Sequence, residues 1–378
     1  MKVLVLSSWF PTPHSVAGVW VLEYVTALRP FVDEIQVVSP TVGTGGWFGV
    51  DTTVDHSQQV PVTRIEVRVP LARGHASLLG PAVMRRLTEA TRAATDWRPD
   101  VIQAFVAFPS GLLATRLGAD LGLPVVYTEV ASDLAEVYGR VSGISICRKL
   151  AQRADLLLTV SAQLREQYRA IAAEPRRHAV EPFPFDGDVF YPPPSPASAD
   201  SDRVVALFCG LLETDQKGMQ VLLPAIAALP EDARSRLCLR VIAYGSRLEQ
   251  YRQQGRELGL EVEWVGKRTL AEIADEMRAA DFLVMPSLHE GMPCVLVEAL
   301  ACGLPVVGSA VGGIPEAVPD SCGLLAPPAD QPGLTNALRR MVSEHASFDR
   351  PTIAATVARS SMREYGARIS ACYRELMP

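Results

Sequence analysis

Cysteine is scarce in this chain of 378 residues, and its spacing excludes two common roles. The seven cysteines are an odd number, lie scattered along the sequence and include no CxxC pair. Neither a disulfide framework nor metal-ligand spacing is therefore indicated, and reduced thiols fit a cytoplasmic protein. We also expect the N-terminal MKVLVLSSWFP to form a first strand rather than a signal peptide, because its apolar run is short and meets Trp and Pro.

The chain also lacks an excess of positive charge and an uninterrupted apolar segment. Its net charge is −6, which argues against general attraction to nucleic acid. The uncharged run from Ala299 to Pro315 is broken by Gly and Pro, so no membrane span is expected. A modest basic trend in the first half is best explained by solvated helix faces, with weak contact to an anionic membrane surface as the alternative; it comprises Arg85, Arg86, Arg92, Arg148, Lys149 and Arg153.

Short β-branched runs alternate with amphipathic stretches along most of the chain. Strands are expected at 3–7, 34–39, 101–105, 125–129 and 156–160, and again at 204–210, 239–245, 261–266, 282–287 and 305–309. The alternation predicts two doubly wound parallel sheets covered by helices on both faces. Residues 1–185 and 203–355 are the expected domains, 186–202 the Pro- and Ser-rich linker, and 356–378 a helix that returns to the first domain.

One segment of the second half combines a buried strand, a loop and a short helix. Strand FLVMPS runs into LHEGM, then Pro293, then CVLVEALAC and Gly303. Pro at a helix start and Gly past its end are typical helix boundaries. We expect the free N–H groups of Cys294, Val295 and Leu296 to form an anion site. Glu290 and Glu298, eight positions apart, would flank it and bind hydroxyl groups.

This segment, HEGMPCVLVEALACGLPVV followed by GGIPE, resembles the E-x7-E signature of the retaining GT-B glycosyltransferases of family four. CGLLETDQKGMQVLL, ADLLLTVS, DGDVFYP and FPTPHSVAGVWV resemble further segments of that family, so the likeness covers most of the chain. It implies two Rossmann-like domains facing a central cleft, an acceptor domain first and a nucleotide-sugar domain second. It also implies front-face transfer with retention of configuration and no metal cofactor.

The resemblance implies a role for individual residues. Glu290 would bind the donor sugar, Lys217 the diphosphate and Glu298 the ribose diol, and Glu290 and Lys217 are the expected catalytic residues. Gly18 would let the first domain's backbone approach the phosphates. The remaining donor-binding residues implied are Gly210, Gly266, Lys267, Arg268, Gly291, Met292, Cys294 and Val295.

Three places depart from the family pattern: one is Phe183–Pro184, where the family has Asn-Gly before the linker, and the other two concern the site. Leu211 stands where the family has a phosphate-binding Arg, and Val130 stands in TEVASDL where the family has a His that faces the donor sugar. The donor sugar could lack the group that His holds, or Glu129, Ser132 or Asp133 could take its role; we favour these two readings together. The alternative is a non-transferring relative, or a nucleotide-sugar epimerase or hydrolase on the same fold.

A dehydrogenase is disfavoured because no GxGxxG follows a strand. The abundance of Ala, Arg, Gly and Pro is typical of a high-GC bacterial gene. Residues 41–53, TVGTGGWFGVDTT, are interpreted as an acceptor loop. Base, sugar, acceptor and oligomeric state are not indicated by the sequence.

Overall fold

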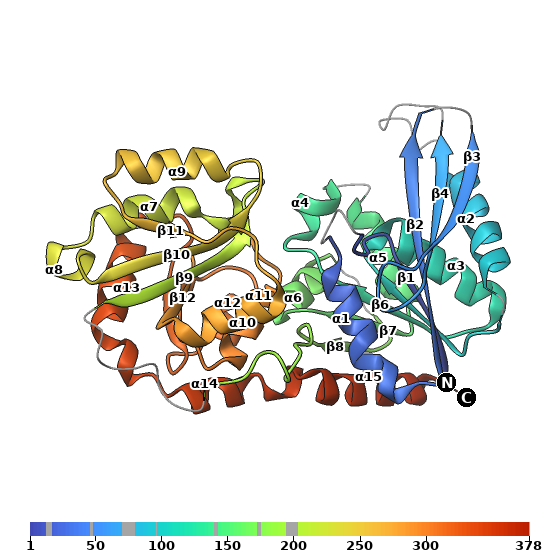
Figure 1. Cartoon of the computed structure of the whole chain (residues 1–378). Helices are drawn as coiled ribbons and strands as arrows, with labels where there is room; N and C mark the ends of the chain where they lie inside the picture. The colour runs from blue at the N-terminus through green and yellow to red at the C-terminus, as the bar shows by residue number, and fades with distance from the viewer. Residues whose placement is uncertain are drawn as a thin grey trace. The chain divides into compact units, whose positions relative to one another are not determined.

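The computed structural model describes residues 1–12, 17–45, 48–69, 80–95, 97–139, 143–171, 175–193 and 203–377. It divides into two compact units (Figure 1). Unit 1 comprises Met1–Pro184 and Met362–Pro378, and unit 2 comprises Phe185–Ser361. The chain's last helix therefore belongs to the same unit as its first strand.

Unit 1 is built on an eight-stranded sheet in the order β3-β4-β2-β1-β5-β6-β7-β8. The strands are β1 (Lys2–Ser7), β2 (Glu34–Thr44), β3 (Gly49–Asp55), β4 (Val62–Val69), β5 (Val101–Phe105), β6 (Val125–Glu129), β7 (Leu156–Thr159) and β8 (His178–Val180). All neighbours pair in parallel except β3 and β4, which are antiparallel. The central strands are almost fully buried, as expected for a parallel sheet covered on both faces.

The helices of unit 1 include one from the far end of the sequence. They are α1 (Val19–Leu28), α2 (Gly80–Ala94), α3 (Leu112–Leu121), α4 (Leu134–Tyr138), α5 (Ile144–Arg153), α6 (Ala162–Ala170) and α15 (Met362–Leu376). Helix α15 lies along α1 (Figure 1), and buried Tyr24 and Tyr373 both donate hydrogen bonds to Gln103 Oε1, at 3.0 and 2.9 Å. This buried polar contact ties the last helix to the middle of the sheet.

The segment 41–53 is not the loop that its Gly and Thr content suggested. Residues 41–44 continue β2, and 49–53 form most of β3; Gly46 and Trp47 lie outside the described residues. The side chains of β3 are almost all exposed, so the strand carries none of the alternation of apolar and polar residues by which strands are usually identified. Strands β4 and β8 were likewise not predicted.

Unit 2 contains a six-stranded sheet in the order β11-β10-β9-β12-β13-β14. Its strands, all parallel, are β9 (Val204–Leu211), β10 (Leu237–Tyr244), β11 (Val262–Trp264), β12 (Phe282–Met285), β13 (Val306–Ser309) and β14 (Gly323–Ala326). The last of these was not predicted. Because the strands are parallel, the loops that follow them all lie at one edge of the sheet.

Eight α-helices and three 3-10 turns are found in the described part of unit 2, and the first of these turns is part of the site described below. This first turn is Asp215–Lys217, and the helices are α7 (Met219–Ala227), α8 (Glu231–Arg234), α9 (Leu248–Glu257), α10 (Leu270–Ala279), α11 (Cys294–Ala301), α12 (Ile314–Ala317), α13 (Gln331–Glu344) and α14 (Arg350–Thr356). Phe208, Leu222, Tyr251 and Leu338 belong to the main apolar core of this unit.

The two ends of unit 2 differ from the ranges that the sequence suggested. Part of the expected linker is packed on unit 2: Phe190 is buried and Arg278 Nη1 donates to the Val189 carbonyl at 2.8 Å. Residues 194–202 lie outside the described residues. The last helix begins at Met362, six residues later than expected. Among the described helices, none is both long and apolar enough to cross a membrane.

Candidate functional site

The predicted catalytic residues lie on adjacent loops at the carboxyl edge of the unit 2 sheet. Lys217 ends the 3-10 turn that follows β9, and Glu290 lies in the loop between β12 and α11. Strands β9 and β12 are neighbours in the sheet, so the two loops meet although 73 residues separate the side chains. Ligands of open α/β sheets bind at this edge.

Lys217 and Glu290 form an ion pair. Lys217 Nζ lies 2.7 Å from Glu290 Oε1, and the hydroxyl of buried Ser287 donates to the same oxygen at 2.7 Å. The Glu290 side chain is 7% exposed and that of Lys217 is 23% exposed. The pair is thus sheltered but reachable, and a bound ligand could contact the charged end of either residue.

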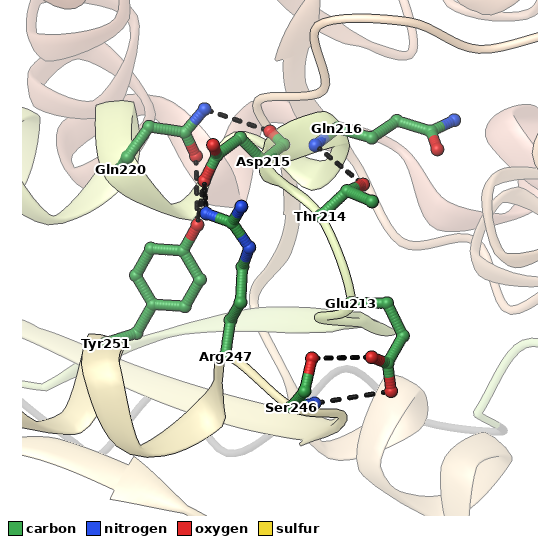
Figure 2. Close-up of polar contacts among 8 residues, drawn as sticks. All are labelled: Glu213, Thr214, Asp215, Gln216, Gln220, Ser246, Arg247 and Tyr251. Carbon is green, nitrogen blue, oxygen red and sulfur yellow. Dashed lines mark hydrogen bonds and ion pairs between the residues drawn. The ribbon is translucent and has the colours of Figure 1, made fainter.

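The turn that carries Lys217 is held by a polar network on its other side (Figure 2). Asp215 Oδ1 accepts hydrogen bonds from Arg247 Nη1 at 2.6 Å and from the Tyr251 hydroxyl at 2.8 Å. Glu213 Oε2 accepts from the Ser246 hydroxyl at 2.6 Å. These contacts attach the turn to α9 and to the loop that precedes it, which limits where the Lys217 side chain can lie.

Backbone contacts also join the turn to the loop after β12. The Leu288 N–H donates to the Gln216 carbonyl at 2.7 Å, and Gln216 Nε2 donates to the His289 carbonyl at 2.9 Å. Gly218 has φ +73°, and a Cβ there would lie 1.8 Å from the Pro286 carbonyl oxygen. Glycine is therefore required at this position both by its backbone conformation and by the close approach of Pro286, the residue after β12.

The start of α11 differs from the expected row of free amides. The Leu296 N–H donates to the Pro293 carbonyl at 3.1 Å, and Cys294 also has a partner. Met292 is buried, whereas Val295 is only half-buried. The Leu296 amide is therefore used within its own helix, and it is not one of the three free N–H groups from which an anion site was predicted.

Gly291 lies in a tight contact between the loop that carries Glu290 and the glycine pair after β13. The Gly313 N–H donates to the Gly291 carbonyl at 2.6 Å. A Cβ on Gly312 would lie 2.0 Å from the Glu290 carbonyl oxygen. Gly312 and Gly313 therefore allow the loop that carries Glu290 to pack closely against the segment between β13 and α12. This contact fixes the position of the Glu290 backbone.

Glu298 is a buried carboxylate on α11. It is 7% exposed, and burial raises its pKa to about 7. No hydrogen bond or ion pair to its carboxylate is found within the described ranges. The Cys209 thiol on β9 lies close enough that Glu298, after burial, contributes to raising its pKa to about 12. A buried carboxylate without donors is costly, so this group is suited to accept hydrogen bonds from ligand hydroxyls.

The remaining predicted donor-binding residues lie along the same edge of the sheet. Lys267 Nζ lies 5.4 Å from the centre of the Tyr244 ring, and Arg268 Nη1 donates to the Lys267 carbonyl at 3.2 Å. Gly266 has φ +80°. A Cβ on Gly210 would lie 3.4 Å from Lys217 Cγ, so a small residue there leaves room for the lysine stem.

In unit 1, Glu129 is unavailable for a ligand, contrary to one reading of the sequence. It is fully buried, and five groups donate to its carboxylate. They are the hydroxyls of Tyr127, Tyr138 and Tyr168 and the N–H groups of Val130 and Ala131. A carboxylate has about four lone-pair sites, so its accepting capacity is filled.

The other unit 1 residues have mixed surroundings. Val130 packs against the apolar core of this unit, while Ser132 and Asp133 are half-buried and Asp133 has a partner. Gly18 has φ +82° and its Cβ would lie 2.3 Å from the Trp9 carbonyl oxygen. Contact with the loop after β1, rather than the approach of a phosphate, is what excludes a side chain at Gly18.

Several residues of the site were missed by sequence reasoning. Ser287, Asp215 and Arg247 hold the Lys217–Glu290 pair or its turn, and Tyr127 and Tyr168 surround Glu129. Of these residues, only Ser287 lies close in the sequence to a predicted site residue, three positions before Glu290, so its contact could have been predicted from the spacing. No group of three or more His, Cys, Asp and Glu that could hold a metal ion is found in the described part of the chain.

Two α/β units, one on an all-parallel sheet and one on a sheet that is parallel except for the β3–β4 pair, are the architecture of the GT-B glycosyltransferases. Two family models match the sequence: "Glycosyl transferase 4-like domain" over residues 17–184 and "Glycosyl transferases group 1" over residues 203–344. The chain belongs to this family of glycosyltransferases.

Individual relatives and a solved structure agree with this placement. The chain is 27% identical over 230 residues to the uncharacterized glycosyltransferase MJ1178 of Methanocaldococcus jannaschii, covering 60% of this chain and 61% of the relative. It is 36% identical over 181 residues to a D-inositol 3-phosphate glycosyltransferase of Saccharomonospora viridis, covering 45% and 40%. These matches span less than two thirds of each relative.

The fold is similar to that of sucrose-phosphate synthase from Thermosynechococcus elongatus. The TM-score is 0.75 at 22% identity, and the match covers 99% of this chain and 98% of the other. At this identity the likeness shows the GT-B fold.

Proposed function

We propose that this protein is a retaining glycosyltransferase that moves a sugar from a nucleotide-diphosphate donor to a hydroxyl acceptor. The observation that carries the proposal is the Lys217–Glu290 pair, 2.7 Å apart, on the same sheet edge as buried Glu298. This arrangement offers one cation and two carboxylates to a ligand that itself contains a diphosphate between two sets of hydroxyl groups.

Lys217 is proposed to contact the diphosphate. Negative charge accumulates on the diphosphate as it leaves the sugar, so a cation fixed beside it stabilises the transition state more than the ground state. The network around Asp215 contributes by holding the turn in place before the donor binds. A preorganised charge costs little reorganisation during the reaction.

The two glutamates are proposed to bind hydroxyl groups at the two ends of the donor. Glu290, held by Lys217 and Ser287, would accept from hydroxyls of the transferred sugar. Glu298 would accept from both hydroxyls of the ribose, because one carboxylate can take two adjacent donors. Its burial then becomes favourable, since the ligand supplies the hydrogen bonds that its present surroundings lack.

Transfer is proposed to occur on the face from which the leaving group departs. The departing phosphate oxygen would accept the proton of the acceptor hydroxyl while that hydroxyl attacks the same side of the sugar. Neither a protein nucleophile nor a metal is required in this scheme, and catalysis consists of positioning and electrostatic stabilisation. Unit 1 is proposed to bind the acceptor, and the protein is proposed to act in the cytoplasm.

A donor screen followed by a transfer assay tests the proposal. Thermal shifts with UDP-, GDP-, ADP- and dTDP-sugars identify the donor, because a ligand that binds only the folded state raises the melting temperature. The identified donor is then incubated with hydroxyl acceptors, and NMR gives the anomeric configuration of the product. Retention supports the proposal. Inversion, or release of free sugar at the same rate with and without every acceptor, contradicts it.

A further inference from the structure

Tyr244 lies on the same sheet edge as the site but has no role in the reaction described above. It is the last residue of β10, the strand between β11 and β9. Lys267 follows β11, Lys217 follows β9 and Glu290 follows β12, so the strand order arranges these residues along the edge. Tyr244 is thus two strands from Glu290, a separation of about 10 Å across the sheet.

Sheet register shows which face Tyr244 occupies. Leu211 pairs with Tyr244 and Cys209 pairs with Ile242 on neighbouring parallel strands. Residues in register on parallel strands point to the same face, and Phe208, one position away, packs into the core on the opposite face. Tyr244 therefore shares a face with Cys209, the thiol whose titration is affected by Glu298.

The Tyr244 ring is exposed enough for a planar ligand group to stack on it. The residue is only half-buried, Lys267 Nζ lies 5.4 Å from its ring centre, and neighbouring Leu211 is 40% exposed. In the described ranges, its hydroxyl makes no hydrogen bond. Burial raises its pKa, with Cys209 and Glu213 contributing, which agrees with a position on the site face of the sheet.

We propose that the Tyr244 ring stacks against the nucleobase of the donor, on the ring face opposite the one over which Lys267 Nζ lies. The assignment rests on the proposed function, in which Glu298 holds the ribose and Glu290 the sugar. A donor with its sugar at Glu290 and its ribose at Glu298 extends its base away from β12. Two described rings end strands there, Tyr244 on β10 and Trp264 on β11. Trp264 pairs in register with Val241 and so lies on the opposite face of the sheet, which leaves Tyr244 on the face of Cys209. Leu211, where a phosphate-binding cation was expected, extends the apolar surface beside it.

The test separates the base from the diphosphate. UDP, GDP and ADP are titrated by calorimetry, and the tightest binder is then compared with inorganic pyrophosphate on the wild-type protein and on Tyr244→Ala, Tyr244→Phe and Lys217→Ala. Loss of the stacking ring should weaken nucleoside diphosphate binding by roughly tenfold to a hundredfold. Tyr244→Ala should leave pyrophosphate binding unchanged, and Tyr244→Phe should retain nucleotide affinity because the ring remains.

The outcomes distinguish this inference from the proposed function. If Lys217→Ala weakens both ligands while Tyr244→Ala weakens neither, the stacking role is overturned and the donor site stands. If Tyr244→Ala weakens the binding of nucleotide and of pyrophosphate equally, the stacking role is also overturned. A general disturbance of the sheet edge would affect the binding of both ligands, whereas loss of a stacking ring would affect only the nucleotide. If no nucleoside diphosphate binds the wild-type protein, the proposed function and the stacking role both fail. Melting temperatures of all variants confirm folding.

Discussion

Lys217 Nζ and Glu290 Oε1 lie 2.7 Å apart, and this ion pair joins the turn after β9 to the loop after β12. Each charge is thereby compensated at the place where we propose that the donor binds. The pair also means that the two residues act as a unit, because removing one leaves the other without its main partner.

Lys217→Ala is expected to lower kcat about 100-fold or more, because the leaving diphosphate loses its cation. Glu290→Gln should cause a comparable loss, and the double variant should lose less than the product of the two effects. Steady-state kinetics of all three variants measure this. Lys2→Ala removes an exposed ion pair with Glu34 in unit 1 and serves as the control that leaves kcat unchanged. Fully multiplicative losses would show that the pair does not act as a unit.

Glu298 should make stability depend on pH. Its pKa is raised by burial to about 7, so between pH 4.5 and pH 7 the folded state keeps a proton that the unfolded state has released. The free energy of unfolding should therefore fall by roughly 3 kcal/mol as pH rises through this window. Denaturant titrations should show that Glu298→Gln lacks this fall. An equal fall in the variant would assign it to other groups.

The same carboxylate should make donor binding depend on pH in the opposite direction. Two ribose hydroxyls donate best to the ionised form, so nucleoside diphosphate affinity should increase from pH 6 to pH 8, with release of a proton on binding. Calorimetry in two buffers of different ionisation enthalpy measures that release. A 2′-deoxynucleoside diphosphate, which offers one hydroxyl fewer, is the matched control. The same pH dependence for both ligands would contradict a ribose role.

Glu129 is expected to be essential for the stability of unit 1. Glu129→Ala leaves two buried tyrosine hydroxyls, the half-buried Tyr138 hydroxyl and two backbone amides without their acceptor, and each unmet buried group costs about 1–3 kcal/mol. The free energy of unfolding should fall by at least about 3 kcal/mol. Tyr138→Phe, which removes one donor, should cost only about 1 kcal/mol. Similar small losses for both variants would show that the cluster is not cooperative.

Leu211→Arg should strengthen nucleotide binding. The leucine is 40% exposed, so the longer side chain fits without disturbing the core, and it adds a cation on the strand that precedes Lys217. Nucleoside diphosphate affinity should increase severalfold, and the gain should shrink as salt is raised because the interaction is electrostatic. Leu211→Gln controls for side-chain length. A gain that is equal in both variants, or insensitive to salt, would argue against a phosphate contact.

The two-domain α/β architecture could be predicted from the sequence because buried parallel strands are continuous apolar runs. The runs near residues 101–105, 156–160 and 282–287 all correspond to strands. Strand β3 escaped prediction because its side chains face solvent and its pairing with β4 depends on a distant segment. The pattern of apolar residues indicates which side chains are buried, and an exposed edge strand buries few of its side chains.

The sequence by itself determined the strand–loop–helix segments that carry Lys217, Glu290 and Glu298, because helix boundaries and strand patterns are local properties. That these segments bind a phosphate and hydroxyl ligand stays a prediction. Tertiary structure alone decided which of these groups meet. Lys217 forms an ion pair with Glu290, 73 residues away, and the Leu296 amide donates within its own helix. The Glu129 carboxylate accepts hydrogen bonds from tyrosines on three different elements. Such contacts depend on strand order and packing, which no local pattern encodes.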